Sequence, residues 1–132
     1  MAGHTIVNLK DVEDMAPKFG FAPSLEARFA GGALGLEKSG VSYQRLAPNF
    51  RMPFGHRHKA QEEVYVIVGG GGRLKLDDEV VDVKRWDVVR VPSDTMRAFE
   101  AGPEGAELLA FGAPNTGPPA EDAEMVPGWW SD

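Results

Sequence analysis

Glycine and proline recur along the whole chain and constrain its fold more than any other feature of the sequence. Sixteen glycines and ten prolines occur among 132 residues. They separate short segments rich in β-branched and aromatic residues, and none of these segments keeps a helical period for long. This spacing is typical of many short strands joined by turns. The sequence therefore predicts an all-β fold.

About nine strands are expected, at the spacing typical of β-sandwiches and barrels. The segment Glu63–Val68 is almost wholly apolar after its first residue, which indicates a buried central strand. Gly69–Gly72 should end this strand, and Asp77–Glu79 should form the loop of a hairpin. One helical turn is expected at Asp11–Met15. The other expected strands are Thr5–Asn8 at an edge, Leu25–Ala30, Val41–Leu46, Arg73–Leu76, Val80–Val83, Val88–Val91, Met96–Glu100 and Glu107–Phe111.

The length of the chain predicts a single domain over residues 1–132. Its core should span residues 24–112, because Pro114, Gly117 and the two prolines that follow argue against regular structure beyond that point. Residues 113–132 are then an extended tail rich in proline and glycine. The tail ends in adjacent tryptophans, Trp129 and Trp130, whose exposure would be a liability. We expect it to fold back on the domain or on a second subunit.

The composition excludes several classes of protein. The chain has no cysteine, so disulfides, thiolate catalysis and cysteine-ligated metals are excluded. Its net charge is −6, and no cluster of lysine and arginine offers a surface for phosphates, so we expect no binding to nucleic acid. No apolar run approaches the length needed to span a membrane, and the first residues lack the pattern of a signal peptide. We expect a cytoplasmic protein without a membrane partner.

The stretch from Pro53 to Tyr65 carries the chemistry. His56 and His58 are two residues apart, so in a strand both side chains point to the same face. Glu63 begins the next strand after a four-residue gap and can lie beside them. Two imidazoles and one carboxylate on one face suit Fe, Mn or Zn and leave coordination positions open for substrate or water. Glu62 competes for the carboxylate role, since strand alternation lets only one of the two face inward.

The pattern His56-x-His58-x₄-Glu63-x₆-Gly70 resembles the first signature of the cupins. The segment Trp86–Ala101 resembles the second signature, because its Asp, its Val-Pro and its Phe stand where the family has them. Together the two segments and the strands between them cover about half of the chain. The resemblance implies a single-domain antiparallel β-barrel of the jelly-roll type.

The second signature departs from the family at Arg97, which stands where cupins usually place the last metal-binding histidine. Arginine has no lone pair to offer and cannot bind a metal. Two interpretations follow. In the first, His56, His58 and Glu63 hold a metal and Arg97 binds an anionic substrate beside it. In the second, Arg97 pairs with Glu63, its charge takes the place of the metal, and the site binds a small molecule without metal.

Other inward-facing side chains are candidate substrate contacts. Tyr65 alternates with Glu63, and Gln44 lies on a preceding strand, where it could offer an amide. Phe99 should line the pocket, as apolar side chains do in most ligand sites. With Arg97, these three residues form the expected substrate-binding set.

The resemblance implies two alternative functions. One is a metal-dependent enzyme of the dioxygenase, isomerase or decarboxylase type that acts on a small, anionic molecule. The other is a non-catalytic barrel that binds a small molecule. Cupins are often dimers, and the edge strand expected at Thr5–Asn8 could pair with a neighbouring chain. We therefore expect a homodimer, which a mass from light scattering would test.

Overall fold

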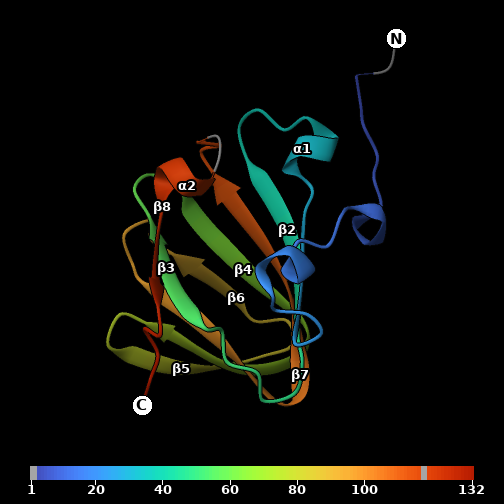
Figure 1. The fold of residues 1–132 in the computed structure, drawn as a ribbon. Coiled ribbons are helices and arrows are strands. Elements are labelled where there is room, and N and C mark those ends of the chain that lie inside the picture. The colour runs from blue at the N-terminus through green and yellow to red at the C-terminus, as the bar shows by residue number, and fades with distance from the viewer. Residues whose placement is uncertain (1–2, 117–118) are drawn as a thin grey trace.

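The computed structural model describes residues 3–116 and 119–132 and has an antiparallel β fold that curls into a half-barrel (Figure 1). Its eight strands are joined in one hydrogen-bonded network, which confirms the all-β prediction. The strands are β1 (Leu25–Phe29), β2 (Gly40–Leu46), β3 (Phe54–His58), β4 (Glu62–Leu76), β5 (Glu79–Lys84), β6 (Val88–Val91), β7 (Arg97–Ala113) and β8 (Ala123–Pro127). The short helical elements are η1 (Leu9–Asp11), η2 (Ala16–Phe19), α1 (Gly31–Leu34) and α2 (Pro119–Asp122).

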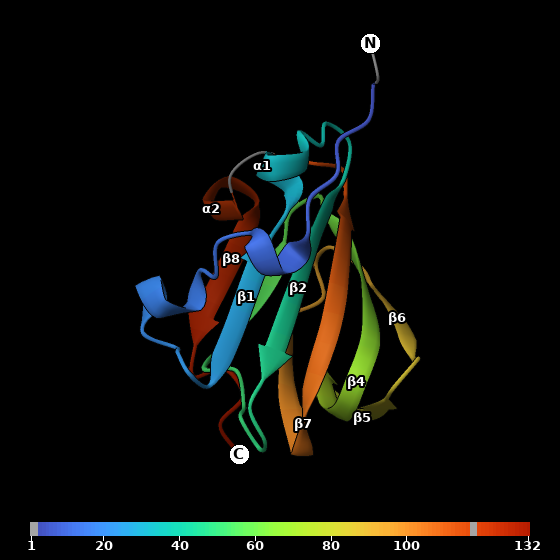
Figure 2. The ribbon, with the colours of Figure 1, turned by 90° about the vertical axis from the view of Figure 1, so that its right-hand side faces the viewer.

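Two long strands, β4 and β7, connect the two halves of the fold. The first half of β4 pairs with β6 and with the second half of β7, which in turn pairs with β2. The second half of β4 pairs with β5 and with the first half of β7. Figure 2 shows β1, β2, β7 and β4 side by side on the outer surface of the first half. Bends in β4 and β7 therefore turn a single sheet into two facing layers around a core.

Glycines make these bends possible, and the prediction that Gly69–Gly72 ends a strand was wrong. The run lies inside β4, which shifts register against β7 twice as it passes through the glycines. Gly70 has a positive φ of 61°, and a Cβ there would overlap the carbonyl oxygen of Gly105 on β7. The run is therefore the site of closest approach between two strands. The separate strands expected at Met96–Glu100 and Glu107–Phe111 are likewise one strand, β7.

Both ends of the chain differ from the prediction. Thr5–Asn8 forms no strand, and in place of one helical turn at Asp11–Met15 there are two, η1 ending at Asp11 and η2 beginning after Met15. The tail, expected to be irregular, forms α2 and then β8, which pairs with β3. This pairing gives β8 a hydrogen-bonding partner that local sequence signals could not reveal. Trp130 is buried, so the tail does fold back on the domain.

The core lies between the two layers and is built from alternate residues of the strands. Its members come from six of the eight strands, and the largest apolar side chains with less than 2% exposure are Leu46, Ile67, Leu74 and Val91. Because the period of a strand is two, the same alternation places Glu63, Tyr65 and Arg97 on the inner face. The inner face therefore changes from apolar to polar toward one end of the barrel.

Glu26 on β1 binds Lys10 of the N-terminal segment on the outer surface of the sheet. Its carboxylate accepts hydrogen bonds from Lys10, Arg28 and Arg45 at 2.7, 2.6 and 3.0 Å. Burial alone would raise the pKa of Glu26, but the three cations outweigh it and lower the pKa from 4.5 to about 2. A carboxylate with a depressed pKa stabilises the folded state above its unfolded pKa, and this contribution is lost as the pH falls.

We expect Glu26→Gln to lower the free energy of unfolding at neutral pH by about 2 kcal/mol, less than the pKa shift alone implies because Lys10 is largely exposed. The variant should also lose less stability than the wild type between pH 4.5 and pH 2, the window set by the two pKa values. Urea unfolding across this range would measure both effects. Glu13→Gln removes an exposed ion pair with Lys18 and should change neither. Parallel pH profiles for Glu26→Gln and wild type would contradict the prediction.

Candidate functional site

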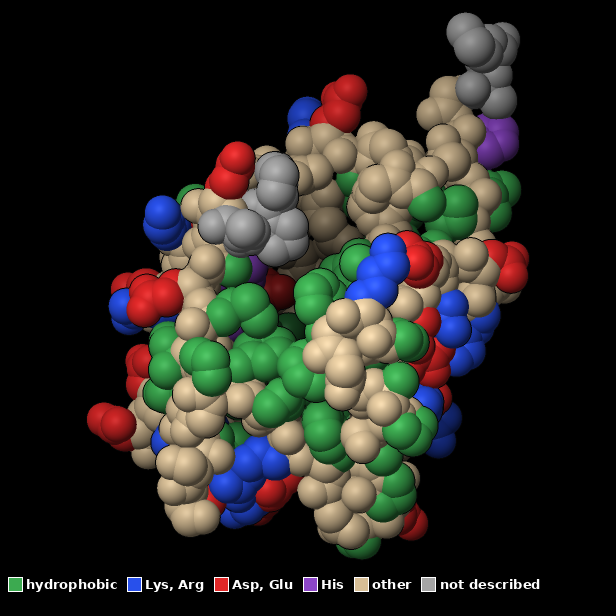
Figure 3. Space-filling model, in the orientation of Figure 1, with side chains coloured by type: hydrophobic (Ala, Val, Ile, Leu, Met, Phe, Trp, Pro, Cys, Tyr) green, Lys and Arg blue, Asp and Glu red, His purple; other side chains and the backbone are tan. Residues whose placement is uncertain are grey.

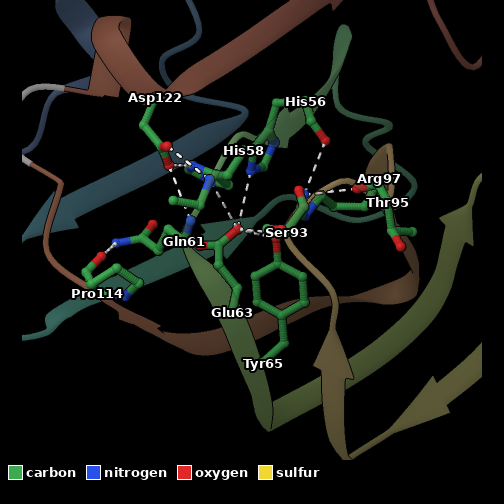
Figure 4. A network of polar contacts seen from close by, with 11 residues as sticks. His56, His58, Gln61, Glu63, Tyr65, Ser93, Thr95, Arg97, Pro114 and Asp122 are labelled. Carbon is green, nitrogen blue, oxygen red and sulfur yellow. Dashed lines mark hydrogen bonds and ion pairs between the residues drawn. The ribbon is translucent and has the colours of Figure 1, made fainter.

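The polar end of the inner face brings together side chains from three strands (Figure 4). His56 and His58 alternate along β3, and Glu63 and Tyr65 alternate along β4. Arg97 begins β7 and lies opposite His56 in the β3–β7 ladder. Strand alternation alone explains why each pair points inward. All five were singled out from the sequence, His56, His58 and Glu63 as metal ligands and Tyr65 and Arg97 as substrate contacts, and the structure brings them together.

One oxygen of Glu63 is the centre of the cluster. Its Oε1 lies 3.2 Å from His56 Nε2 and 3.3 Å from His58 Nε2. It also accepts a hydrogen bond of 3.0 Å from the Tyr65 hydroxyl. Glu62 lies on the other face of β4, where it forms an exposed ion pair with Arg90. The geometry therefore places Glu63, and not Glu62, beside the histidines.

The spacing of these atoms fits a metal ion. One ligand atom from each of His56, His58 and Glu63 lies within 4.8 Å of the others. Two neighbouring ligands with metal bonds of about 2.1 Å lie about 3 Å apart when they subtend a right angle. The distances of 3.2 and 3.3 Å from Glu63 Oε1 to the two histidine nitrogens match this value. The His-His-Glu group could therefore hold a divalent metal, and its donor types suit Fe, Mn or Zn.

The protonation of the cluster also suits this role. Burial lowers the pKa of His56, although the carboxylate of Glu63 partly opposes the effect, so a neutral imidazole is favoured. Burial would raise the pKa of Glu63, but the hydrogen bond with His56, the neighbouring ring of His58 and the charge of Arg97 hold it well below its usual value. Burial and the charge of Glu63 raise the pKa of Tyr65, so its hydroxyl stays protonated and donates. His56 thus presents a neutral nitrogen donor and Glu63 an anionic oxygen donor.

Asp122 also belongs to the site, although no local signal in the sequence pointed to it. Its Oδ2 lies 2.9 Å from Nδ1 of His58, on the side of the ring away from Glu63. Asp122 belongs to α2 in the tail and is 64 residues from His58. Since the tail was expected to be irregular, no periodicity could place this carboxylate next to the histidine.

Arg97 is almost completely buried, with 1% of its surface exposed. Its Nη1 donates to the carbonyl oxygens of His56, Ser93 and Thr95, the last at 2.7 Å. Its Nη2 lies 3.2 Å from Glu63 Oε1, an ion-pair distance without the direction of a hydrogen bond. Among the described residues, Nε and Nη2 have no hydrogen-bond partner. These two nitrogens form one edge of the guanidinium group, which can pair with two oxygens of a carboxylate.

The remaining candidates lie farther from the cluster. Gln44 faces inward on β2, but the ladders place it level with Ile67, about 13 Å along the sheet from the level of Glu63. Phe99 lies two residues beyond Arg97 on the same face, with 6% exposure, and belongs to the apolar core. Contact of either residue with a substrate stays a prediction.

Apolar side chains surround the approach to the cluster. Phe54 lies next to His56, with ring centroids 6.5 Å apart, and packs against Phe21 at 5.9 Å. Figure 3 shows a hollow on this face, bordered by apolar side chains. A separate hollow of about 660 Å³ lies at the bends of β4 and β7, but its charged lining includes the ion pair of Arg73 with Glu100. The candidate site is therefore the His-His-Glu cluster, and not the larger hollow at the bends of β4 and β7.

The structure is similar to several solved structures. A cupin protein from Bacteroides fragilis, BF4112, matches with a TM-score of 0.71 and 21% identity over 89% of this chain and 90% of that one. The polyketide cyclase RemF from Streptomyces resistomycificus matches with a TM-score of 0.73 and 18% identity over 97% and 87% of the two chains. An oxalate decarboxylase from Bacillus subtilis matches with a TM-score of 0.75 and 22% identity over 92% of this chain but only 33% of that chain.

Sequence comparisons add little to this result. No family model matches the chain. An uncharacterized protein from Methanocaldococcus jannaschii, MJ1618, is 38% identical over 45 residues, which are 34% of this chain and 36% of that protein. In the part of the chain that the structure describes, no helix has the length and apolar character needed to cross a membrane. The structural matches confirm the fold implied by the two sequence signatures, and the chain has the antiparallel β fold seen in cupin structures.

Proposed function

We propose that this protein binds a divalent metal ion through His56, His58 and Glu63, and binds a small anionic organic molecule beside it with the help of Arg97. The position of His58 between two carboxylates carries the proposal. Its Nδ1 faces Asp122 at 2.9 Å and its Nε2 faces Glu63 at 3.3 Å. When the ring is neutral it has only one N–H, so one of the two carboxylates then faces a lone pair. A cation shared by Nε2 and Oε1 removes this repulsion.

The surroundings of the cluster support an anionic ligand with an apolar part. Arg97 contributes a buried positive charge and two N–H groups without hydrogen-bond partners among the described residues. Phe54 and Phe21 provide apolar surface near His56. A molecule with a carboxylate and a short hydrocarbon or aromatic body would match both features.

Each residue then has a distinct task in a metal-dependent reaction. His56, His58 and Glu63 would hold the metal, which supplies Lewis-acid or redox chemistry when bound. Tyr65 donates to Glu63 and fixes the direction of its carboxylate. Arg97 orients the anion, and the apolar side chains limit the access of water. A more specific hypothesis is that the protein is an enzyme of the dioxygenase, isomerase or decarboxylase type. An oxalate decarboxylase and a polyketide cyclase are among the structural matches.

One observation favours a second function, a binding protein without metal. The Nη2 of Arg97 lies as close to Glu63 Oε1 as His56 Nε2 does, at 3.2 Å. The guanidinium group already neutralises the carboxylate, and a fixed positive charge beside the site lowers the affinity for a cation. Under this alternative, His56 and His58 would donate hydrogen bonds to a ligand.

Metal content separates the two functions. Protein purified without chelators should contain close to one Fe, Mn or Zn per chain, and the metal-stripped protein should take one up in a calorimetric titration. His56→Ala should weaken this binding by at least about 100-fold, because it removes one of only three protein ligands. His4→Ala is a matched control, since His4 lies in the N-terminal segment and is exposed. Little metal in the wild type and no heat of binding would favour the metal-free alternative.

The homodimer and the cytoplasmic location stay predictions. The strand at Thr5–Asn8, which the dimer was expected to use, does not form. The outer face of the sheet offers a different surface for a second copy, because Val88 on β6 and Phe111 on β7 are 65% and 41% exposed there.

A further inference from the structure

Asp122 contacts both the ring of His58 and the loop that connects the two strands of the site. Its carboxylate lies 2.9 Å from His58 Nδ1 and accepts hydrogen bonds from the backbone N–H groups of Ala60 and Gln61 at 3.0 and 3.3 Å. Its carbonyl oxygen accepts from the N–H of Lys59 at 2.9 Å. The residue is 5% exposed, so these contacts are shielded from water. One side chain thus holds the histidine at the end of β3 and the loop that leads to β4.

The tail holds Asp122 in place through two separate contacts. The first is the ladder of β8 with β3, in which Ala123, next to Asp122, pairs with His58. The second is the docking of the tryptophans on the outer surface. The ring of Trp129 packs on Gly55, where a Cβ would come within 2.5 Å of it. Asp122 is therefore fixed by the same strand that carries the histidines.

Trp130 completes this anchor. It is 5% exposed, and the guanidinium groups of Arg51 and Arg73 lie 4.4 and 5.3 Å from its ring. Arg51 also donates to the carbonyl oxygen of Trp130 at 3.1 Å. The end of the chain is thereby joined to the loop before β3 and to β4. Displacement of the tail would move Asp122 away from His58.

From these contacts we infer that Asp122 is a positioning residue of the metal site, and that the segment 119–132 completes the site. Asp122 keeps the proton of His58 on Nδ1, so the lone pair of Nε2 points to Glu63. A neutral ring with its N–H on Nδ1 is the form that binds a metal through Nε2. The hydrogen bonds to Ala60 and Gln61 also set the separation between His58 and Glu63. This inference rests on the proposed metal site.

Asp122→Asn tests the inference with little change in shape. The amide cannot reproduce all three accepted hydrogen bonds, and its N–H₂ group can donate to Nδ1 and so favour the tautomer with the proton on Nε2. In the metal-free protein, ¹⁵N NMR of the imidazoles at alkaline pH should show His58 protonated on Nδ1 in the wild type and shifted toward Nε2 in the variant. The affinity for Zn²⁺ should fall by about 10- to 100-fold, as for other partners of metal-binding histidines.

Glu124→Gln is the matched control. Glu124 lies on β8, two residues from Asp122, and forms an exposed ion pair of 2.9 Å with Arg57, the residue between the two histidines. The control should keep the wild-type tautomer and affinity. Wild-type protein with His58 protonated only on Nε2 would overturn the inference, even if Asp122→Asn failed to fold. An unchanged tautomer in a folded Asp122→Asn protein would also overturn it. If the tautomer shifts but the wild type binds no Zn²⁺, Asp122 keeps its positioning role and the proposed metal site fails.

Discussion

Gly70→Ala is expected to lower the free energy of unfolding by about 4 kcal/mol, among the largest losses for a single methyl group. Two costs add at this position. The backbone has a positive φ of 61°, which disfavours any residue with a Cβ. The new Cβ would also overlap the carbonyl oxygen of Gly105, which belongs to the backbone of β7 and cannot rotate away. Urea unfolding followed by circular dichroism would measure the loss.

Two control variants separate these costs. Gly20→Ala tests the backbone angle alone, because φ is 79° but no atom lies within 4 Å of the new Cβ. It should cost about 1 kcal/mol. Gly102→Ala tests a nearby site on β7 without a positive φ, where the closest atom is 3.4 Å away, and it should cost less still. If Gly70→Ala cost no more than Gly20→Ala, the close approach of β4 and β7 at the bend would be refuted.

The same glycines show why the sequence predicts strands better than it predicts their connection. Alternation and β-branching placed β1, β2, β5 and β6 near their observed positions, because these signals depend on local residues alone. A glycine run is ambiguous, since it can end a strand or allow two backbones to touch. The close contact between two backbones involves Gly105, which is 35 positions away from Gly70. No pattern of neighbouring residues around Gly70 reveals this contact.

The candidate site likewise has one part that the sequence predicts and one part that it does not. His56 and His58 share a face by strand alternation, and Glu63 follows within one short loop, so the sequence predicts their cluster. Asp122 could not be predicted, because its place depends on the pairing of β8 with β3 across more than 60 residues. Gln44 was expected near the site on its orientation alone. The alternation of side chains along a strand determines which face of the sheet Gln44 occupies. The register between neighbouring strands determines its position along the strand direction, and this register could not be predicted.

Arg97 decides how the charge of Glu63 is balanced. Under the proposed function, two cations would compete for this carboxylate: the guanidinium group at 3.2 Å and a metal held with His56 and His58. A buried carboxylate without any cation is costly, whereas two cations beside one carboxylate repel each other. The stability of the protein and its affinity for metal are therefore linked through Glu63.

Arg97→Met is accordingly expected to destabilise the metal-free protein by about 3–5 kcal/mol, because it leaves a buried carboxylate without its cation and removes the guanidinium hydrogen bonds to three carbonyl groups. Added Zn²⁺ or Mn²⁺ should stabilise the variant more than the wild type, since the metal then supplies the only cation. A tenfold gain in affinity would add about 1.4 kcal/mol at saturating metal. Urea unfolding with and without metal gives both quantities.

The neighbouring pair of Glu62 and Arg90 provides the control on the opposite face of β4. These side chains lie 2.9 Å apart but are 52% and 68% exposed. Water already solvates both charges, so Arg90→Met should cost less than about 0.5 kcal/mol and leave the metal response unchanged. An equal metal response in Arg97→Met and wild type would show that the guanidinium group does not compete with the metal. No response in either protein would leave Arg97 as the permanent cation of Glu63, because the variant would then stay destabilised at every metal concentration.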